Sequence, residues 1–176
     1  MAKNIEIKAR VRNLTLLEQK ARELSGGPPE IIHQRDVFFP CTHGRLKLRR
    51  LSPSLGQLVF YDRPDLAGPK TSDYTVVETN EPANLLDALG RALGTSTQVN
   101  KTRRLYMVGR TRVHVDTVEN LGDFVELEVV MSPGEALSEG EKEADDLMAR
   151  LGIRREDLVM GAYADLLEAC SSSPLL

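Results

Sequence analysis

The sequence has few aromatic residues, two cysteines and no long apolar run. Phe, Trp and Tyr make up 5% of its 176 residues, and Trp is absent. This scarcity disfavours an oligonucleotide-binding barrel, because such domains stack bases on aromatic side chains beside a basic groove. Cys41 and Cys170 lie far apart without metal-ligand spacing, so we expect two reduced thiols. No apolar stretch approaches the roughly 20 residues of a membrane helix.

The charge pattern narrows the class of protein further. The first residues, MAKNIEIKAR, enter a charged, strand-like pattern directly, so we expect no secretory signal and a cytoplasmic protein. A net charge of -3 gives no general attraction to nucleic acid or to an anionic membrane. However, 12 of the 23 basic residues fall in the stretches 8–12, 45–50 and 101–112. This clustering of basic residues favours binding of a compact anion. A solvated charged face would show the same clustering.

Alternation of apolar and polar residues with period two predicts eight strands. Between Asn4 and Val11, for example, Ile5 and Ile7 alternate with Glu6 and Lys8. The predicted strands cover 4–11, 31–39, 45–51, 57–63, 73–79, 97–108, 111–118 and 123–131.

Apolar residues at helical spacing predict helices over 14–24, 82–93, 162–170 and a long acidic one that Ser132-Pro133 caps. Thr15 and Glu18 resemble a capping box for the first of them. About eight antiparallel strands suffice to close a barrel around one small ligand. We therefore predict an α+β fold: a closed eight-stranded antiparallel β-barrel, or tunnel, with amphipathic helices packed outside. Residues 1–170 form this single domain, and residues 171–176 form a flexible tail.

Several predicted strands carry charge on one face and aliphatic residues on the other. If helices cover the aliphatic faces, the charged faces converge inside the barrel. The alternative is a half-open sheet with a solvated polar face. Buried charges need partners of opposite sign or a metal ion, and both signs recur on several of these strands. The faces predicted to converge are those of Glu6-Lys8-Arg10, Arg45-Lys47-Arg49, Arg110-Arg112-His114-Asp116 and Glu126-Glu128.

A triphosphate with a divalent metal ion suits such an interior. Guanidinium groups bind phosphate oxygens through paired hydrogen bonds. Carboxylates beside a polyanion are favourable only if a hard cation such as Mg²⁺ or Mn²⁺ lies between them. We therefore expect a small-molecule triphosphate as the partner, with no nucleic acid and no membrane. The sequence leaves the oligomeric state, including a homodimer, open.

Several motifs resemble the CYTH superfamily, the triphosphate tunnel metalloenzymes. Asn4-Ile5-Glu6-Ile7-Lys8 resembles the ExExK signature of that superfamily. The likeness covers most of residues 4–167, and members include class IV adenylyl cyclases, thiamine triphosphatases and inorganic triphosphatases. The further matching segments, in order, are Gln34 to Phe39 (QRDVFF), Arg45 to Arg49 (RLKLR), Lys101 to Arg103 (KTR) and Val113 to Glu128 (VHVDTVENLGDFVELE).

The resemblance implies roles for individual residues. Glu6, Glu126 and Glu128 would bind the metal ion, with Asp116 helping through the metal or through a hydrogen bond to a ligand. Glu6, Lys8, Glu126 and Glu128 would be the catalytic residues, with Mg²⁺ or Mn²⁺ as the cofactor. The phosphate chain would be held by Lys8, Arg45, Lys47, Arg49, Arg63, Lys101 and Arg103. We interpret His114 as an ordinary polar residue and Tyr163, which resembles a tyrosine of the family, as a packing residue.

Two departures from the family pattern affect the chemistry. Asn4 replaces the first Glu of the signature, which predicts a weaker or single metal site. Arg63 lies where many relatives carry a lysine that can act as a base. Because arginine stays protonated, it can only stabilise charge there, and a hydrolase would need water activated by the metal.

The sequence favours metal-dependent hydrolysis of an organic or nucleoside triphosphate. This reaction needs only a bound phosphate chain, a metal ion and water. The first alternative is cyclisation of ATP to 3′,5′-cyclic AMP with release of pyrophosphate, which also needs an adenine pocket. The second is a binder of polyphosphate or of a phosphorylated ligand that has no catalytic activity.

Overall fold

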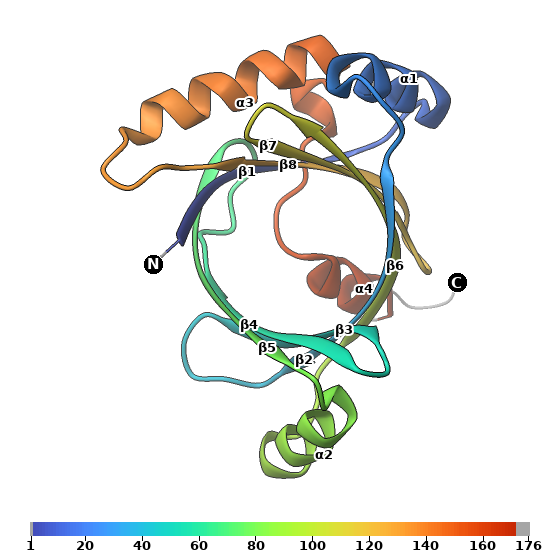
Figure 1. The fold of residues 1–176 in the computed structure, drawn as a ribbon, viewed down its shortest axis with the longest axis vertical. Helices are drawn as coiled ribbons and strands as arrows, with labels where there is room; N and C mark the ends of the chain where they lie inside the picture. Colours follow the sequence, from blue (N-terminus) through green and yellow to red (C-terminus); the bar gives the residue numbers. More distant parts are fainter. Residues whose placement is uncertain (1, 172–176) are drawn as a thin grey trace.

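The computed structural model describes residues 2–171, and their strands close into one antiparallel barrel (Figure 1). The order around the barrel is β1-β5-β4-β3-β2-β6-β7-β8, and β8 returns to β1 through pairs such as Lys8 with Glu126. This confirms the predicted α+β barrel and excludes the half-open sheet. The strands are β1 (Ala2–Arg10), β2 (Glu30–Phe39), β3 (Arg45–Ser52), β4 (Leu55–Asp62), β5 (Lys70–Thr79), β6 (Gln98–Val108), β7 (Thr111–Val118) and β8 (Gly122–Val130).

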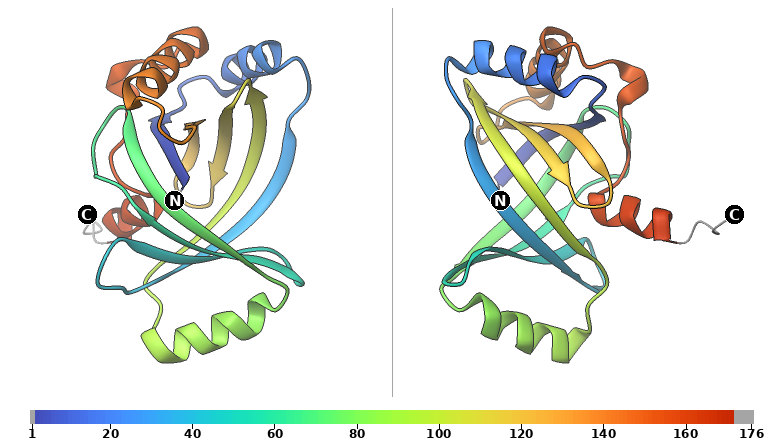
Figure 2. Two further views of the ribbon diagram at one scale, coloured as in Figure 1. Left: turned by 60° about the vertical axis from the view of Figure 1, so that its left-hand side comes forward. Right: turned by 90° about the vertical axis from the view of Figure 1, so that its right-hand side faces the viewer.

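Helices cover parts of the outer face of the barrel. Figures 1 and 2 show α1 (Leu14–Ser25) and α3 (Leu137–Leu151) on one side and α2 (Pro82–Leu93) on the opposite side. The aliphatic face of β1, including Ile5 and Ile7, is buried in one cluster with residues of α1 and α3. Burial of these outward-facing aliphatic side chains stabilises the helices on the barrel and turns the alternate, charged residues inward.

Two smaller apolar clusters complete the packing. In one, Leu85, Leu86 and Leu89 of α2 cover Phe39 and Leu48. In the other, Tyr163 at the start of α4 (Tyr163–Ser171) packs edge-on against Phe124, with 5.1 Å between the ring centroids. Figure 2 shows α4 at one end of the barrel, where the second cluster lies. The remaining element is the 3₁₀ helix η1 (Arg155–Asp157).

The first predicted helix begins at residue 14 as expected, but its predicted cap and some other predicted boundaries are wrong. Asn13, not Thr15, caps α1: its Oδ1 accepts a hydrogen bond from the Leu16 amide at 3.1 Å. The helix predicted to begin at Ser132-Pro133 begins at Leu137, because Gly134 adopts a positive φ of 77° and the preceding segment turns. β5 begins at Lys70 rather than at residue 73.

The sequence predicts a flexible tail at residues 171–176 and no membrane-spanning helix. Of the predicted tail at 171–176, Ser171 is the last residue of α4, and the rest lies outside the described residues. Within residues 2–171, no helix combines the length and the apolar character that crossing a membrane requires.

Close approach of α3 to the barrel generates a first prediction. A Cβ added at Gly140 would meet the Met131 side chain and lie 2.7 Å from Cγ1 of Ile5, whereas at Gly90 in α2 the nearest atom is 3.7 Å away. Alanine normally stabilises a helix interior by about 0.5–1 kcal/mol relative to glycine. We expect Gly90→Ala to raise the free energy of unfolding by that amount. Gly140→Ala should lower it by about 1–3 kcal/mol, the usual cost of overpacking.

Denaturant unfolding of the two variants measures this difference. Gly90→Ala is the matched control, because it makes the same change in a helix with free space. Equal stabilisation by both substitutions would show that α3 does not pack as closely on β1 as described.

Candidate functional site

A charged cavity of about 380 Å³ occupies the inside of the barrel. Every strand contributes alternate residues to its wall, as Glu6 and Lys8 of β1 and Glu126 and Glu128 of β8 illustrate. Ala162 and Tyr163, at the start of α4, also line it. Among the described residues, seven basic and four acidic side chains lie on this wall, so the lining has an excess of positive charge.

Asp36 on β2 holds three of these cations in place. Its carboxylate accepts two hydrogen bonds of 2.8 Å from Arg49 and lies 3.2 Å from Lys47 Nζ and 3.7 Å from Lys101 Nζ. Burial opposes ionisation of Asp36, but Arg49, Lys47 and Lys101 outweigh it and hold its pKa well below the usual range. The carboxylate is therefore charged at neutral pH and fixes the positions of the cations around it.

A second network links β6, β7 and β8. Arg103 donates two hydrogen bonds to Asp116, at 2.8 and 2.7 Å, and one of 2.8 Å to Glu126. The Tyr163 hydroxyl donates to Asp116 at 2.9 Å. Asp116 is fully buried and does not line the cavity. Asp116 therefore holds the Arg103 guanidinium in place from behind the cavity wall. Tyr163 makes its polar contact with Asp116 in addition to the predicted packing.

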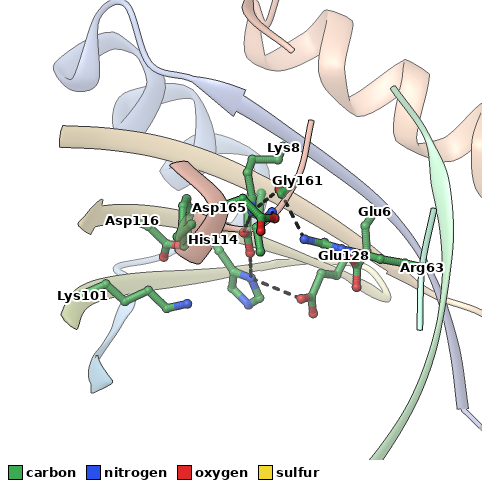
Figure 3. A network of polar contacts seen from close by, with 12 residues as sticks. Glu6, Lys8, Arg63, Lys101, His114, Asp116, Glu128, Gly161 and Asp165 are labelled. Atoms are coloured by element: carbon green, nitrogen blue, oxygen red, sulfur yellow. Dashed lines mark hydrogen bonds and ion pairs between the residues drawn. The ribbon is translucent and has the colours of Figure 1, made fainter. Parts of the chain in front are cut away.

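A third group of contacts lies beside β1. Glu6 Oε2 accepts a 2.5 Å hydrogen bond from Arg63 (Figure 3). Lys8 Nζ lies 3.2 Å from Glu126 Oε1. Both Lys8 and Arg63 also donate to the carbonyl oxygen of Gly161, at 3.1 and 3.4 Å. Burial raises the pKa of Glu6, and the charge of Glu128 raises it further, while Arg63 opposes the shift.

The site also contains a cluster suited to a metal ion. One ligand atom each from His114, Glu126 and Glu128 lies within 4.8 Å of the others. Figure 3 shows the His114 ring directed at the Glu128 carboxylate. Asn4 Oδ1 is buried without a hydrogen-bond partner and lies in the same lining. Carboxylate and amide oxygens are ligands that Mg²⁺ and Mn²⁺ accept in proteins, and transition ions also accept imidazole nitrogen, so this set fits a divalent ion such as the sequence predicts.

Most of the predicted site residues meet in the cavity. Arg45 does not line it: its guanidinium donates to both oxygens of Asp165 in α4, at 2.8 and 2.6 Å. Arg10, Arg45 and Arg110, all predicted to face inward, are absent from the lining, and Arg110 instead pairs with Glu135 and Glu143 outside the barrel. The predicted residues that do line the cavity are Glu6, Lys8, Lys47, Arg49, Arg63, Lys101, Arg103, Glu126 and Glu128.

Sequence reasoning missed Asp36 and His114 as members of the site. Asp36 belongs to the QRDVFF segment, which the prediction used without giving this residue a role. His114 alternates with Arg112 and Asp116 on the charged face of β7, so its spacing was a usable signal.

Comparison with known proteins places this geometry in a family. Over 123 residues the chain is 28% identical to adenylate cyclase CyaB of Aeromonas hydrophila, and the match spans 70% of this chain and 62% of that protein. The solved PH1012 protein of Pyrococcus horikoshii superposes with a TM-score of 0.83 at 25% identity, covering 93% of this chain and 98% of that one.

A more distant structure has the same fold. It is a Hippeastrum protein described as a proposed adenylyl cyclase with a dominant triphosphatase activity. Its TM-score is 0.64 at 15% identity, and the match covers 98% of this chain and 97% of that chain. The family model for the CYTH domain matches residues 2–163. The chain therefore belongs to the CYTH domain family.

Proposed function

We propose that the protein is a metal-dependent triphosphatase that holds an organic or nucleoside triphosphate inside the barrel. The excess of buried positive charge on the cavity wall carries this proposal. Members of the CYTH family act as triphosphatases or adenylyl cyclases. A triphosphate supplies the missing negative charge, because each of its phosphates can accept hydrogen bonds from several cations at once.

The cations divide into two groups by what holds them. Lys47, Arg49 and Lys101 surround Asp36, while Arg103 is held by Asp116. Since these side chains are held by carboxylates of the protein itself, they are already oriented before a phosphate chain arrives. Such preorganisation lowers the entropic cost of binding and favours a fixed position for the scissile phosphate. The second group is Lys8, which contacts Glu126, and Arg63, which contacts Glu6. Since these glutamates are the proposed metal ligands, both cations lie where phosphate and metal would meet.

The carboxylates Glu6, Glu126 and Glu128 would hold the metal ion. Asp116 contributes indirectly by orienting Arg103 and Tyr163. A divalent ion, when bound, neutralises phosphate charge and activates water. Arg63 is paired with Glu6 and stays protonated, so it can stabilise developing negative charge but cannot act as a base.

Adenylyl cyclisation is the second candidate, and two observations favour it. One relative is named an adenylate cyclase. The cavity wall also has an apolar part, which includes Val59, Tyr61, Tyr74 and Val76 and could accommodate an adenine ring. A binder without turnover is the third candidate, because Asn4 replaces a carboxylate at the metal-binding end of β1.

Product analysis separates the three candidates. The protein is incubated with ATP, thiamine triphosphate or tripolyphosphate and with Mg²⁺ or Mn²⁺. Release of inorganic phosphate supports the triphosphatase, whereas cyclic AMP with pyrophosphate identifies a cyclase. Tight binding of all three compounds without any product identifies a binder and contradicts the proposed enzyme.

Glu126→Gln tests the metal-binding carboxylates. We expect kcat to fall by about 100-fold or more, because even changes to groups that position metal ligands cost about 10–100-fold. Tripolyphosphate binding should persist, since the cations of the wall remain and one negative charge is removed. Glu143→Gln is the control, because Glu143 lies outside the barrel against Arg110 and Thr111. Full turnover by Glu126→Gln would contradict the assignment of Glu126.

The pKa of Lys47 makes phosphate binding depend on pH. Burial, together with the charge of Arg49, lowers the pKa of Lys47 to about 8, although Asp36 opposes the shift. Below this pH the side chain is charged and attracts phosphate, whereas above it the charge is lost. We therefore expect tripolyphosphate affinity to weaken by up to about tenfold per pH unit above that pKa.

Calorimetric titration of tripolyphosphate between pH 6.5 and 9.5 measures this effect. Lys47→Arg is the reference, because arginine keeps its charge throughout and the ligand's own ionisation affects both proteins equally. The affinity ratio between wild type and variant should fall with rising pH. A constant ratio would mean that Lys47 does not lose its proton in this range.

A further inference from the structure

His114 is the histidine of the chain that lies inside the barrel. It is on β7, between Arg112 and Asp116, and its side chain is 5% exposed. Its Nδ1 atom is buried without a hydrogen-bond partner and lies 3.8 Å from Glu126 Oε2 and 3.8 Å from Glu128 Oε1. A buried polar atom without a hydrogen-bond partner destabilises the fold, so this nitrogen needs an explanation.

The spacing is too long for hydrogen bonds and suits a shared ion. Hydrogen bonds of this type are about 2.7–3.2 Å long, so 3.8 Å leaves His114 Nδ1 unbonded to either carboxylate. Three donor atoms that each lie about 2.0–2.2 Å from one ion are separated from one another by about 3–4 Å. The three atoms of this cluster, within 4.8 Å of one another, need only small movements to reach that arrangement.

The other partners of the two carboxylates leave room for such an ion. Lys8 contacts Oε1 of Glu126, Arg103 contacts Oε2 of Glu126, and Arg112 lies 3.6 Å from Oε2 of Glu128. Among the described contacts, Glu128 Oε1 has His114 Nδ1 as its neighbour and neither a lysine nor an arginine. Because each carboxylate oxygen has two lone pairs, Glu126 can keep Arg103 and still bind a metal ion.

We infer that His114 Nδ1 binds a divalent transition-metal ion together with Glu126 and Glu128, so that this site prefers Mn²⁺, Co²⁺ or Zn²⁺ to Mg²⁺. Mg²⁺ is a hard ion that takes oxygen ligands, whereas transition ions also accept imidazole nitrogen. The inference rests on the metal dependence in the proposed function and goes further, because it assigns a nitrogen ligand and a class of metal. A bound metal ion would also give His114 Nδ1 the partner that it lacks and would bridge it to the carboxylates of Glu126 and Glu128 that face it.

The first test reads the ligand directly and needs no turnover. Mn²⁺ alone is added to the full chain, and pulsed electron paramagnetic resonance measures coupling between the ion and histidine nitrogen. We expect imidazole coupling in the wild type, with a changed pattern when the histidines carry ¹⁵N. The coupling should disappear in His114→Gln. It should persist in the double variant His33→Gln/His43→Gln, because His33 faces Thr102 away from the cavity and His43 is exposed.

The second test measures metal preference by calorimetry without substrate. His114→Gln should weaken Co²⁺ binding by about tenfold or more, since even groups that only orient a metal ligand are worth about 10–100-fold. Mg²⁺ affinity should change much less, because the carboxylates remain. Equal weakening for Co²⁺ and Mg²⁺ would assign His114 an electrostatic or structural role and overturn the inference.

The outcomes distinguish this inference from the proposed function. Bound Mn²⁺ without nitrogen coupling in the wild type overturns the role of His114, while phosphate release with Mg²⁺ still supports the triphosphatase. Turnover in the presence of a chelator, without any metal binding, overturns both. If His114→Gln fails to fold, the wild-type spectrum with ¹⁵N-histidine decides alone.

Discussion

The structure depends on compensation of charge within a closed space. Burial removes water from the cations on the inner wall, so each needs a nearby carboxylate or an anionic ligand. Asp36 meets this need for three cations and Asp116 for Arg103. Because each of these carboxylates lies on a strand next to those of the cations it holds, pairing of charges and pairing of strands support each other. The same arrangement leaves surplus positive charge that a polyanion can satisfy.

The barrel could be predicted from the sequence, because alternation with period two is a local property of each strand. Ile5 and Ile7, or Val125 and Leu127, indicate an outer face wherever the strand lies in the fold. The charged residues between them then face inward, which located nine of the predicted site residues correctly in the cavity. The charge pattern gave the expectation of phosphate and metal, and the motif resemblance added roles for individual residues, but neither gave the contacts between side chains.

Contacts across the barrel could not be predicted, because they depend on register and on distant segments. Asp36 contacts three cations only because β3 and β6, which carry them, lie on either side of β2. Arg45 shares the face of Lys47 and Arg49 in sequence, yet it lies beyond the cavity and meets Asp165 from a helix 120 residues away. The cap of α1 and the start of α3 were missed because Asn13 acts through one side-chain hydrogen bond and Gly134 through a positive φ, and residue spacing determines neither.

The closing seam of the barrel also affects how the chain folds during synthesis. β1 pairs with β5 and β8, and Lys8 reaches Gly161, 153 residues further along. Because β1 is synthesised before the other strands of the barrel, it waits for β8, the last of them, before its pairing is complete. Contacts of such long sequence separation slow folding, and an unpaired strand edge invites aggregation in the meantime. The polar face of β1 would help to keep the nascent chain soluble until closure.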